Sequence, residues 1–213
     1  MTTAGPHDDQ PLVTAGPTLE NAETAVVLVH GRGASAQSIV RTMEPIHREG
    51  VAYLAPQAAR NTWYPNSFLA PTEKNEPGRT SGLAAVGRAL TTATDAGVPL
   101  ERIALVGFSQ GACLASEFVA RNPRPYGGLA ALSGGLIGET IEESSFSGSL
   151  EGTPVFLGCS DEDPHIPVDR VESTARVFEG LDATVTKRIY RGMGHTINPD
   201  EFDHLSAMVE DLL

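Results

Sequence analysis

The feature that most limits the fold of this chain is the regular alternation of short apolar runs with longer helical segments. The runs are rich in Val, Ile, Leu and Ala, which is typical of strands buried on both faces of a sheet. The expected strands are residues 25–29, 51–55, 102–106, 128–132, 154–159 and 183–190. The last of them alternates apolar and polar residues, as a strand at a sheet edge does.

The segments between these runs carry helical patterns and helix start signals. The expected helices are 36–49, 80–96 (beginning at Thr80 or Ser81), 110–121, 168–178 and 199–213, with Ser35 capping the first. Strands that alternate with helices form mainly parallel, doubly wound sheets. We therefore predict one α/β domain over residues 1–213, with helices on both faces of the sheet. Residues 1–11 are expected to form a loose tail and residues 12–23 a short edge hairpin.

One long segment, residues 57–79, has neither pattern. It carries Trp63, Tyr64 and Phe68 among asparagines and prolines. A loop of this length in a compact domain is usually functional or mobile. Trp63 and Tyr64 are therefore candidate substrate contacts, with plain packing as the alternative.

The charge balance excludes some classes of partner. The formal net charge is −12, and Lys74 and Lys187 are the only lysines. An acidic surface repels nucleic acids and anionic membranes, so we expect neither as a partner. A halophilic source is one hypothesis for such a composition; an acidic protein of ordinary salt tolerance is the other.

The expected location is the cytoplasm. The first residues contain no basic stretch followed by an apolar core, so no signal peptide is expected. No apolar run approaches the ~20 residues that span a bilayer, so no membrane insertion is expected. Cys113 and Cys159 lie in apolar segments and are predicted to be buried free thiols.

The motif that carries chemistry is Gly107-Phe108-Ser109-Gln110-Gly111. It fits G-x-S-x-G, follows a predicted buried strand and opens a predicted helix, which is the context of a nucleophile elbow. The two glycines allow neighbouring backbone to approach a strained turn. Ser109 is therefore the predicted nucleophile.

A serine hydroxyl needs a base to take its proton, and with this elbow the order along the chain is serine, acid, histidine. His195 follows a strand in a glycine-rich loop, where ligands bind in such folds. It is the predicted base, with His165 as the rival. The acid is expected in the loop after residue 159, where position alone leaves Asp161, Glu162 and Asp163 open.

An oxyanion hole should complete the site. One donor is expected to be the backbone N–H of Gln110, which follows the nucleophile. The other should come from the loop His30-Gly31-Arg32-Gly33 after the first predicted strand. Arg32 N–H is our choice and Gly33 N–H the rival, whereas His30 is expected to be structural.

Four motifs in order resemble the phospholipase/carboxylesterase family of α/β-hydrolases, over about residues 24–213. They are LVHGRGAS, GFSQGA, DEDPHIP and GMGHTI. The third resembles the family segment in which the aspartate before proline is catalytic, which points to Asp163, with Asp161 second. The resemblance implies an α/β-hydrolase fold without a large cap domain. Segment 57–79 departs from the family pattern.

The resemblance implies hydrolysis of carboxylic ester or thioester bonds without a cofactor, and we predict a serine carboxylesterase for short- to medium-chain acyl esters. No cluster of His, Cys and carboxylate residues has the spacing of metal ligands, so no metal is expected. The expected partner is a small-molecule ester, and the family makes a homodimer plausible. Ile166, next to the predicted acid, is a further candidate substrate contact. Alternative enzymes are an acyl-protein thioesterase, a lysophospholipase, or a hydrolase of aromatic breakdown products similar to dienelactone hydrolases. The alternative outside enzymes is a non-catalytic ligand-binding module.

Overall fold

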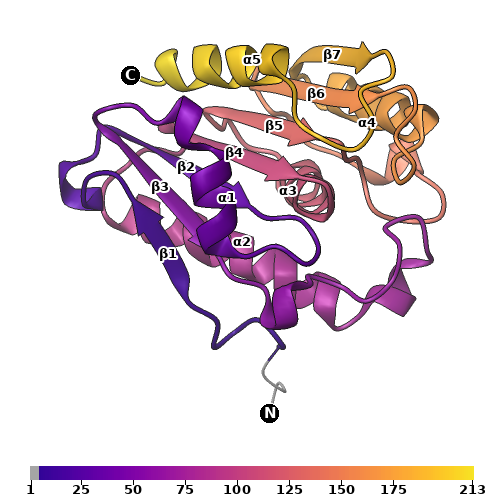
Figure 1. The fold of residues 1–213 in the computed structure, drawn as a ribbon, viewed down its shortest axis with the longest axis horizontal. Helices are drawn as coiled ribbons and strands as arrows, with labels where there is room; N and C mark the ends of the chain where they lie inside the picture. The colour runs from indigo at the N-terminus through magenta and orange to yellow at the C-terminus, as the bar shows by residue number, and fades with distance from the viewer. Residues whose placement is uncertain (1–4) are drawn as a thin grey trace.

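Seven strands form one sheet in the computed structural model, which describes residues 5–213 (Figure 1). The strands are β1 (Leu12–Ala15), β2 (Thr24–Val29), β3 (Val51–Pro56), β4 (Ile103–Phe108), β5 (Gly128–Leu132), β6 (Pro154–Ser160) and β7 (Thr184–Tyr190). Their order is β1-β3-β2-β4-β5-β6-β7, and every neighbouring pair is parallel except β1 with β3. The predicted mainly parallel α/β sheet is confirmed, and β7 lies at an edge as expected.

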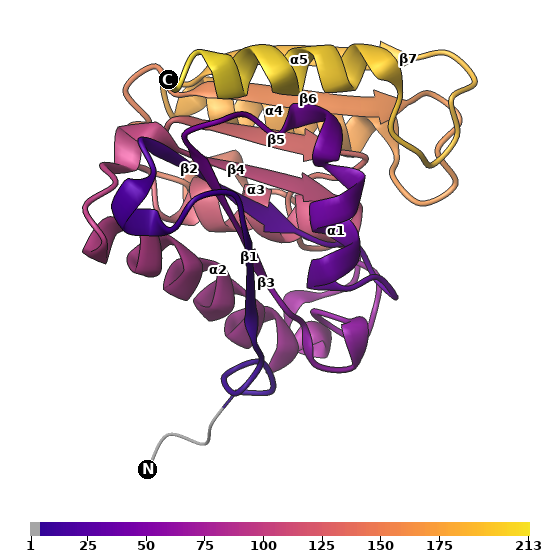
Figure 2. The ribbon, with the colours of Figure 1, turned by 60° about the vertical axis from the view of Figure 1, so that its left-hand side comes forward.

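Helices cover both faces of this sheet (Figure 2). They are α1 (Ala36–Thr42), α2 (Gly78–Asp95), α3 (Gln110–Arg121), α4 (Val168–Gly180) and α5 (Pro199–Glu210). Buried side chains of α1 and α5 belong to one apolar cluster, and those of α2, α3 and α4 belong to the other. The sheet therefore separates two cores, as in doubly wound folds.

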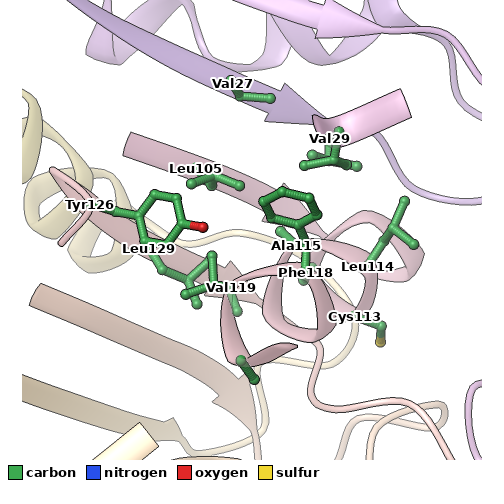
Figure 3. Close-up of a cluster of buried hydrophobic side chains, with 14 of the residues drawn as sticks. Val27, Val29, Leu105, Cys113, Leu114, Ala115, Phe118, Val119, Tyr126 and Leu129 are labelled. Atoms are coloured by element: carbon green, nitrogen blue, oxygen red, sulfur yellow. The ribbon is translucent and has the colours of Figure 1, made fainter. Parts of the chain in front are cut away.

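The strand residues divide between these cores in alternation. Along β2, Val27 and Val29 pack on the α3 side, whereas Val26 and Leu28 pack on the α1 side. Successive strand side chains point to opposite faces, so a strand buried on both sides must be apolar throughout. Figure 3 shows Val27 and Val29 together with Leu105 and the apolar face of α3. This packing explains the continuous apolar runs in the sequence.

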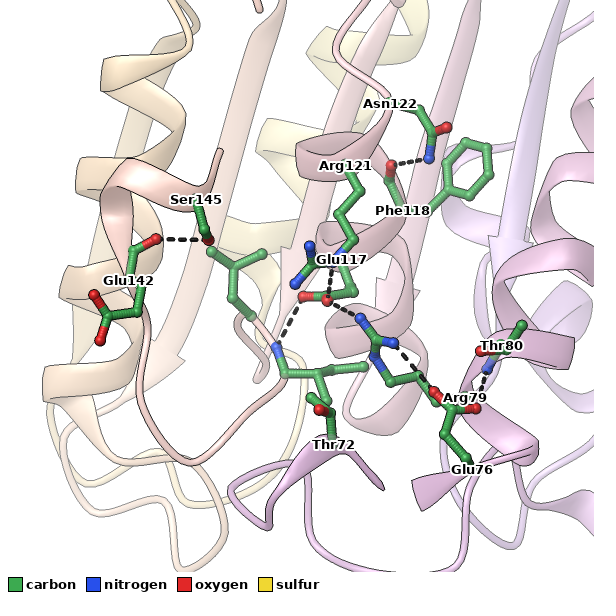
Figure 4. Close-up of polar contacts among 12 residues, drawn as sticks. Thr72, Glu76, Arg79, Thr80, Glu117, Phe118, Arg121, Asn122, Glu142 and Ser145 are labelled. Atoms are coloured by element: carbon green, nitrogen blue, oxygen red, sulfur yellow. Dashed lines mark hydrogen bonds and ion pairs between the residues drawn. The ribbon is translucent and has the colours of Figure 1, made fainter. Parts of the chain in front are cut away.

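A buried carboxylate fixes α3 against its neighbours (Figure 4). Glu117 is fully buried, and its Oε1 accepts hydrogen bonds from Arg79 of α2 and from Arg121 one turn later in α3. Its Oε2 accepts a hydrogen bond of 3.2 Å from the amide of Ile137, beyond β5. A buried charge is tolerated when it is paired and hydrogen-bonded. The network thus joins α2, α3 and the segment after β5.

Two predictions for the N-terminal segment are wrong. The expected hairpin over residues 12–23 does not form, because β1 pairs with β3. Residues 5–11 are not a loose tail, and residues 1–4 of that prediction lie outside the described residues. His7 is buried: its Nε2 donates to the carbonyl of Trp63 (2.9 Å), and its Nδ1 accepts from the amide of Ala59 (3.0 Å). These partners are distant in sequence, so local composition gave no sign of them.

The first helix is shorter than predicted. Ser35 caps α1 as expected, with its side chain accepting from the amide of Ser38. The helix ends at Thr42 instead of residue 49, and a short 3₁₀ turn follows over Glu44–Ile46. Pro45 lies in this turn. Proline disfavours helical geometry at the residue before it and cannot donate a helical hydrogen bond, so the α-helix stops there.

Both cysteines are buried and free, as predicted. Burial raises the pKa of the Cys113 and Cys159 thiols to about 12. Within residues 5–213, none of the helices combines the length and apolar character required to cross a membrane.

Helix α5 begins with a buried acid. Asn198 and Glu201 form a capping box, in which the carboxylate Oε2 accepts from the amide of Asn198 (2.9 Å). The Glu201 side chain is fully buried, and within the described chain its Oε1 has no hydrogen-bond partner. Burial is the main cause that raises the pKa of Glu201 to about 7.

Glu201 should make stability depend on pH. The folded protein holds the Glu201 proton more tightly than the unfolded chain does. The contribution of this proton to the unfolding free energy is therefore complete below pH 4.5 and is lost as the pH rises through about 7. The difference between the folded and unfolded pKa values corresponds to about 3 kcal/mol. Glu201→Gln cannot ionise, so its unfolding free energy relative to wild type should rise between pH 5 and pH 8 in urea titrations. Asp203→Asn, on the exposed side of α5, is the control. Equal pH slopes for Glu201→Gln and wild type would contradict the assignment.

Candidate active site

The predicted site residues meet at one edge of the sheet. They lie in the loops that follow the carboxyl ends of β2, β4, β6 and β7. Because neighbouring parallel strands end at the same edge, residues 30–33, 109–110, 161–167 and 191–197 come together there. Ligands bind at this edge in open α/β sheets.

Ser109 lies in a sharp turn between β4 and α3. Its φ of 56° and ψ of −121° lie in a region that residues with a side chain rarely adopt. A Cβ on Gly107 would come within 2.5 Å of the carbonyl oxygen of Gly111, and a Cβ on Gly111 would overlap the carbonyl of Val29. The two glycines of the motif therefore let the strand, the helix and β2 pack closely enough to form this turn.

Three side chains form a continuous hydrogen-bonded chain. Nε2 of His195 lies 2.8 Å from Oγ of Ser109, and Nδ1 of His195 lies 2.7 Å from Oδ2 of Asp163. The Asp163 side chain is fully buried, whereas 19% of the His195 side chain is exposed. If Nδ1–H donates to the carboxylate, Nε2 is free to accept the serine proton. This is the relation among nucleophile, base and orienting acid in serine hydrolases.

Asp163 is held as an anion. Burial alone would raise the pKa of its carboxyl, but the hydrogen bond from His195 and those from the amides of His165 and Ile166 bring the pKa below its usual value. Asp161 has a different partner, because its Oδ1 accepts from the amide of Gly192 (2.8 Å). The structure thus places Asp163, and not Asp161, at the imidazole.

The loop that carries His195 is held by contacts with the ends of β6 and β4. Besides the bond from Gly192 to Asp161, the amide of Gly194 donates to Oγ of Ser160 at 3.0 Å. Ser160 is fully buried at the end of β6. The ring of Phe108 packs against His195 with 5.1 Å between centroids. Residues at the carboxyl ends of β4 and β6 therefore set the position of the imidazole.

Two backbone amides are available for an oxyanion. Gln110 is the first residue of α3, where helical N–H groups have no partner within the helix. Among residues 5–213, neither the amide of Gln110 nor that of Arg32 donates to a protein acceptor. The rival Gly33 amide is occupied, because it donates to the carbonyl of Asn61 at 2.7 Å. The geometry favours Arg32 over Gly33.

A cavity of about 450 Å³ opens beside Ser109. Its lining residues come from the 57–79 segment, the elbow, α3 and the loops after β2, β6 and β7: Arg32, Tyr64, Pro65, Asn66, Ser67, Phe68, Ser109, Gln110, Cys113, His165, Ile166 and His195. Cavities of this size hold small ligands. Of the three predicted substrate contacts, Tyr64 and Ile166 line the cavity.

Trp63, the third predicted contact, does not line this cavity, and that prediction is wrong. Its side chain is completely buried, and its Nε1 donates to the carbonyl of His30 at 2.8 Å. The His30 ring lies 4.9 Å from the indole, and Nε2 of His30 accepts from the amide of Ala58. Trp63 and His30 thus hold the 57–79 segment onto the sheet edge.

Two polar side chains fasten this segment from the catalytic side. The side chain of Gln110 accepts from the amide of Trp63 (2.9 Å) and donates to the carbonyl of Tyr64 (2.9 Å). The Arg32 guanidinium donates to the carbonyls of Tyr64, Pro65 and Asn66. The sequence pointed only to the backbone amides of Gln110 and Arg32, because side-chain bonds to a distant loop leave no local pattern.

Two other lining residues were not predicted as contacts. Cys113 lies in the first turn of α3, where its amide donates to the carbonyl of Ser109 at 3.0 Å. His165, considered above only as a rival base, lines the cavity with its ring centroid 5.0 Å from that of His195. The backbone amide of His165 donates to the Asp163 carboxylate. The imidazole that contacts this carboxylate is that of His195, through Nδ1.

A second cavity of about 470 Å³ also borders His195. Its walls are mostly apolar and include Ile39, Phe108, Ile197 and Phe202. His195 is the residue that the two cavities share. His195 therefore borders two cavities of similar size and different polarity.

Comparison with known proteins agrees with this architecture. A sequence model of the phospholipase/carboxylesterase family matches residues 13–213. The chain is 33% identical over 122 residues to acyl-protein thioesterase 1 of Saccharomyces cerevisiae and 32% identical over 121 residues to that of Gibberella zeae. Each match covers 56% of this chain and about half of the relative, 53% and 52% respectively.

A solved structure matches over nearly the whole chain. A phospholipase/carboxylesterase from Dyadobacter fermentans superposes with a TM-score of 0.92 and 38% sequence identity, over 98% of this chain and 100% of the other. The Arabidopsis thaliana protein SOBER1, at 20% identity, has the same fold with a TM-score of 0.71. Together with the family model, these matches show that the chain belongs to the phospholipase/carboxylesterase family of α/β-hydrolases, whose members are serine hydrolases of ester bonds.

Proposed function

We propose that the protein is a serine carboxylesterase that hydrolyses short- to medium-chain acyl esters through Ser109, His195 and Asp163. The observation that carries this proposal is the continuous contact from Oγ of Ser109 through His195 to Asp163, at 2.8 and 2.7 Å. Such a chain activates a hydroxyl that is otherwise a poor nucleophile. The family match supports the same reaction class.

In the acylation step, Oγ of Ser109 attacks the ester carbonyl while Nε2 of His195 takes the hydroxyl proton. The buried Asp163 carboxylate stabilises the imidazolium and keeps the ring oriented. The backbone N–H groups of Arg32 and Gln110 bind the oxyanion of the tetrahedral intermediate. Loss of one such donor typically costs about 2.7–4 kcal/mol of transition-state stabilisation. His195 then protonates the departing alcohol.

In the deacylation step, water enters where the alcohol has left. His195 takes a proton from this water as it attacks the acyl-enzyme, and returns the proton to Ser109 as the acid departs. The same two amides bind the second oxyanion. Tyr64 and Ile166 lie along the cavity in which the acyl group is expected. Its volume of about 450 Å³ suits a short or medium chain.

Thioester hydrolysis is the second candidate, because identity to fungal acyl-protein thioesterases favours it. The two activities share the acyl-enzyme and differ in the leaving group. The net charge of −12 is unfavourable for nucleic acid or an anionic membrane surface. We therefore propose a small cytoplasmic ester as the substrate of the primary activity.

The proposal predicts one covalent adduct on Ser109. Intact-mass spectrometry after treatment with a small fluorophosphonate should show a single addition, and peptide mapping should place it on Ser109. Turnover of p-nitrophenyl esters of increasing acyl length, in low and high salt, should show a preferred short or medium chain. Matched p-nitrophenyl esters and acyl thioesters would rank the two activities. Absence of both adduct and turnover at every salt concentration would favour a ligand-binding module.

A further inference from the structure

The cavity beside Ser109 carries a positive charge without an acidic partner. Among its lining residues within the described chain, Arg32 is the arginine and none is Asp, Glu or Lys. None of the ion pairs formed within residues 5–213 includes Arg32. This is unusual in a protein whose net charge is −12, because carboxylates are abundant elsewhere on its surface.

The Arg32 guanidinium is held in place but is not neutralised. It donates to three carbonyls of the 64–66 segment, from Nη1 at 3.0 Å and from Nη2 at 2.9 and 2.7 Å. A guanidinium has five N–H donors, so Nε–H and one N–H of Nη1 remain. Carbonyl oxygens orient the group without cancelling its charge. Such a fixed arginine suits recognition of a carboxylate.

The two cavities around His195 indicate which part of the substrate meets this charge. Ser109 and Gln110 line the cavity that contains Arg32, whereas the apolar cavity is lined by Phe108, Ile197 and Phe202. In an acyl-enzyme the acyl carbon is bonded to Oγ of Ser109, so the acyl chain belongs in the first cavity. The leaving alcohol is protonated by His195, which also borders the second cavity.

We propose that the preferred substrates are hemiesters of short dicarboxylic acids, in which Arg32 binds the free carboxylate of the acyl part and the apolar cavity receives an apolar alcohol. This inference rests on the proposed esterase function and names its substrate class. The ester C–O bond breaks, the proton of Ser109 passes through His195 to the alcohol, and water then releases the dicarboxylic acid. No co-reactant besides water is needed.

The test compares two esters that differ at one end. Benzyl hydrogen succinate and benzyl butyrate have the same acyl length and the same alcohol, with a carboxylate in place of a methyl group. We expect kcat/KM of the wild-type protein to be roughly tenfold to hundredfold higher for the succinate, mainly through KM. This preference should weaken in 1 M salt, because Arg32 is exposed and the Debye length falls to about 3 Å.

Two sets of variants assign the preference to Arg32. Arg32→Gln should bring the succinate-to-butyrate ratio to about one or below, whereas Arg32→Lys should keep most of it. Because Arg32 also holds the 64–66 segment, a second pair of variants, at Ser67, leaves Arg32 unchanged. Ser67 lines the same cavity, and its Oγ accepts from the amide of Leu69. Ser67→Asp adds a carboxylate to the cavity and should lower the ratio severalfold, whereas Ser67→Asn, of the same size, should keep it.

The outcomes separate this inference from the proposed function. Hydrolysis of butyrate without a preference for succinate, or a preference that survives both Arg32→Gln and Ser67→Asp, would overturn the inference and leave the esterase function standing. Faster hydrolysis of 4-(butyryloxymethyl)benzoate than of benzyl hydrogen succinate would place the anion on the alcohol side and overturn our assignment of the cavities. Failure of all three esters, together with no fluorophosphonate adduct on Ser109, would overturn both.

Discussion

Replacement of Ser109 by alanine is expected to lower kcat for ester hydrolysis by roughly 10⁶-fold and to leave the fold intact. The hydroxyl oxygen is the atom that would bond to the substrate, and alanine offers no nucleophile in its place. Its hydrogen-bond partner within the described residues is Nε2 of His195, on the partly exposed side of the site, so little stability depends on it. Active-site-titrated kinetics with a p-nitrophenyl ester and a thermal unfolding curve would measure both effects.

Ser116→Ala is the matched control for this variant. Ser116 lies on α3, the helix that follows Ser109; it is buried, and within the described chain its hydroxyl has no hydrogen-bond partner. It does not line the cavity beside Ser109. Its loss should therefore change kcat by less than about twofold. Wild-type turnover by Ser109→Ala, with a contaminating esterase excluded, would rule out Ser109 as the nucleophile.

The second large effect is expected at the acid. Asp163→Asn should lower kcat by about 10⁴-fold, because an amide can donate to Nδ1 of His195 and so favour the tautomer that cannot accept the serine proton. The backbone donors at His165 and Ile166 still find an oxygen in asparagine, so the loop should keep its shape. Steady-state kinetics from pH 6 to pH 9 would measure the loss.

Asp161→Asn is the control that separates the two candidate acids. Asp161 accepts from the amide of Gly192 through Oδ1, and asparagine retains that acceptor. Its activity should stay within a few-fold of wild type. An inactive Asp161→Asn beside an active Asp163→Asn would assign the acid to Asp161 instead.

The sequence by itself determined the layered fold and the motifs of the site. Strands such as β4 and β5 are apolar throughout because they are buried on both faces, and this local pattern is visible without any knowledge of their neighbours. The elbow at Ser109 is equally local, since its two glycines and its serine belong to one turn. The family resemblance added Asp163 to that list, but position alone left three acids open.

Only the tertiary structure decided the features that depend on contacts between distant segments. It buried Trp63 against His30, packed the segment around His7 against the 57–79 segment, and paired β1 with β3. It also turned the Arg32 side chain into the cavity beside Ser109, although the sequence had indicated only its backbone amide. Sequence patterns record which side chains a segment must bury or expose. They do not record which distant carbonyl or ring will meet a given side chain, because that is fixed when the loops at the carboxyl edge of the sheet pack together.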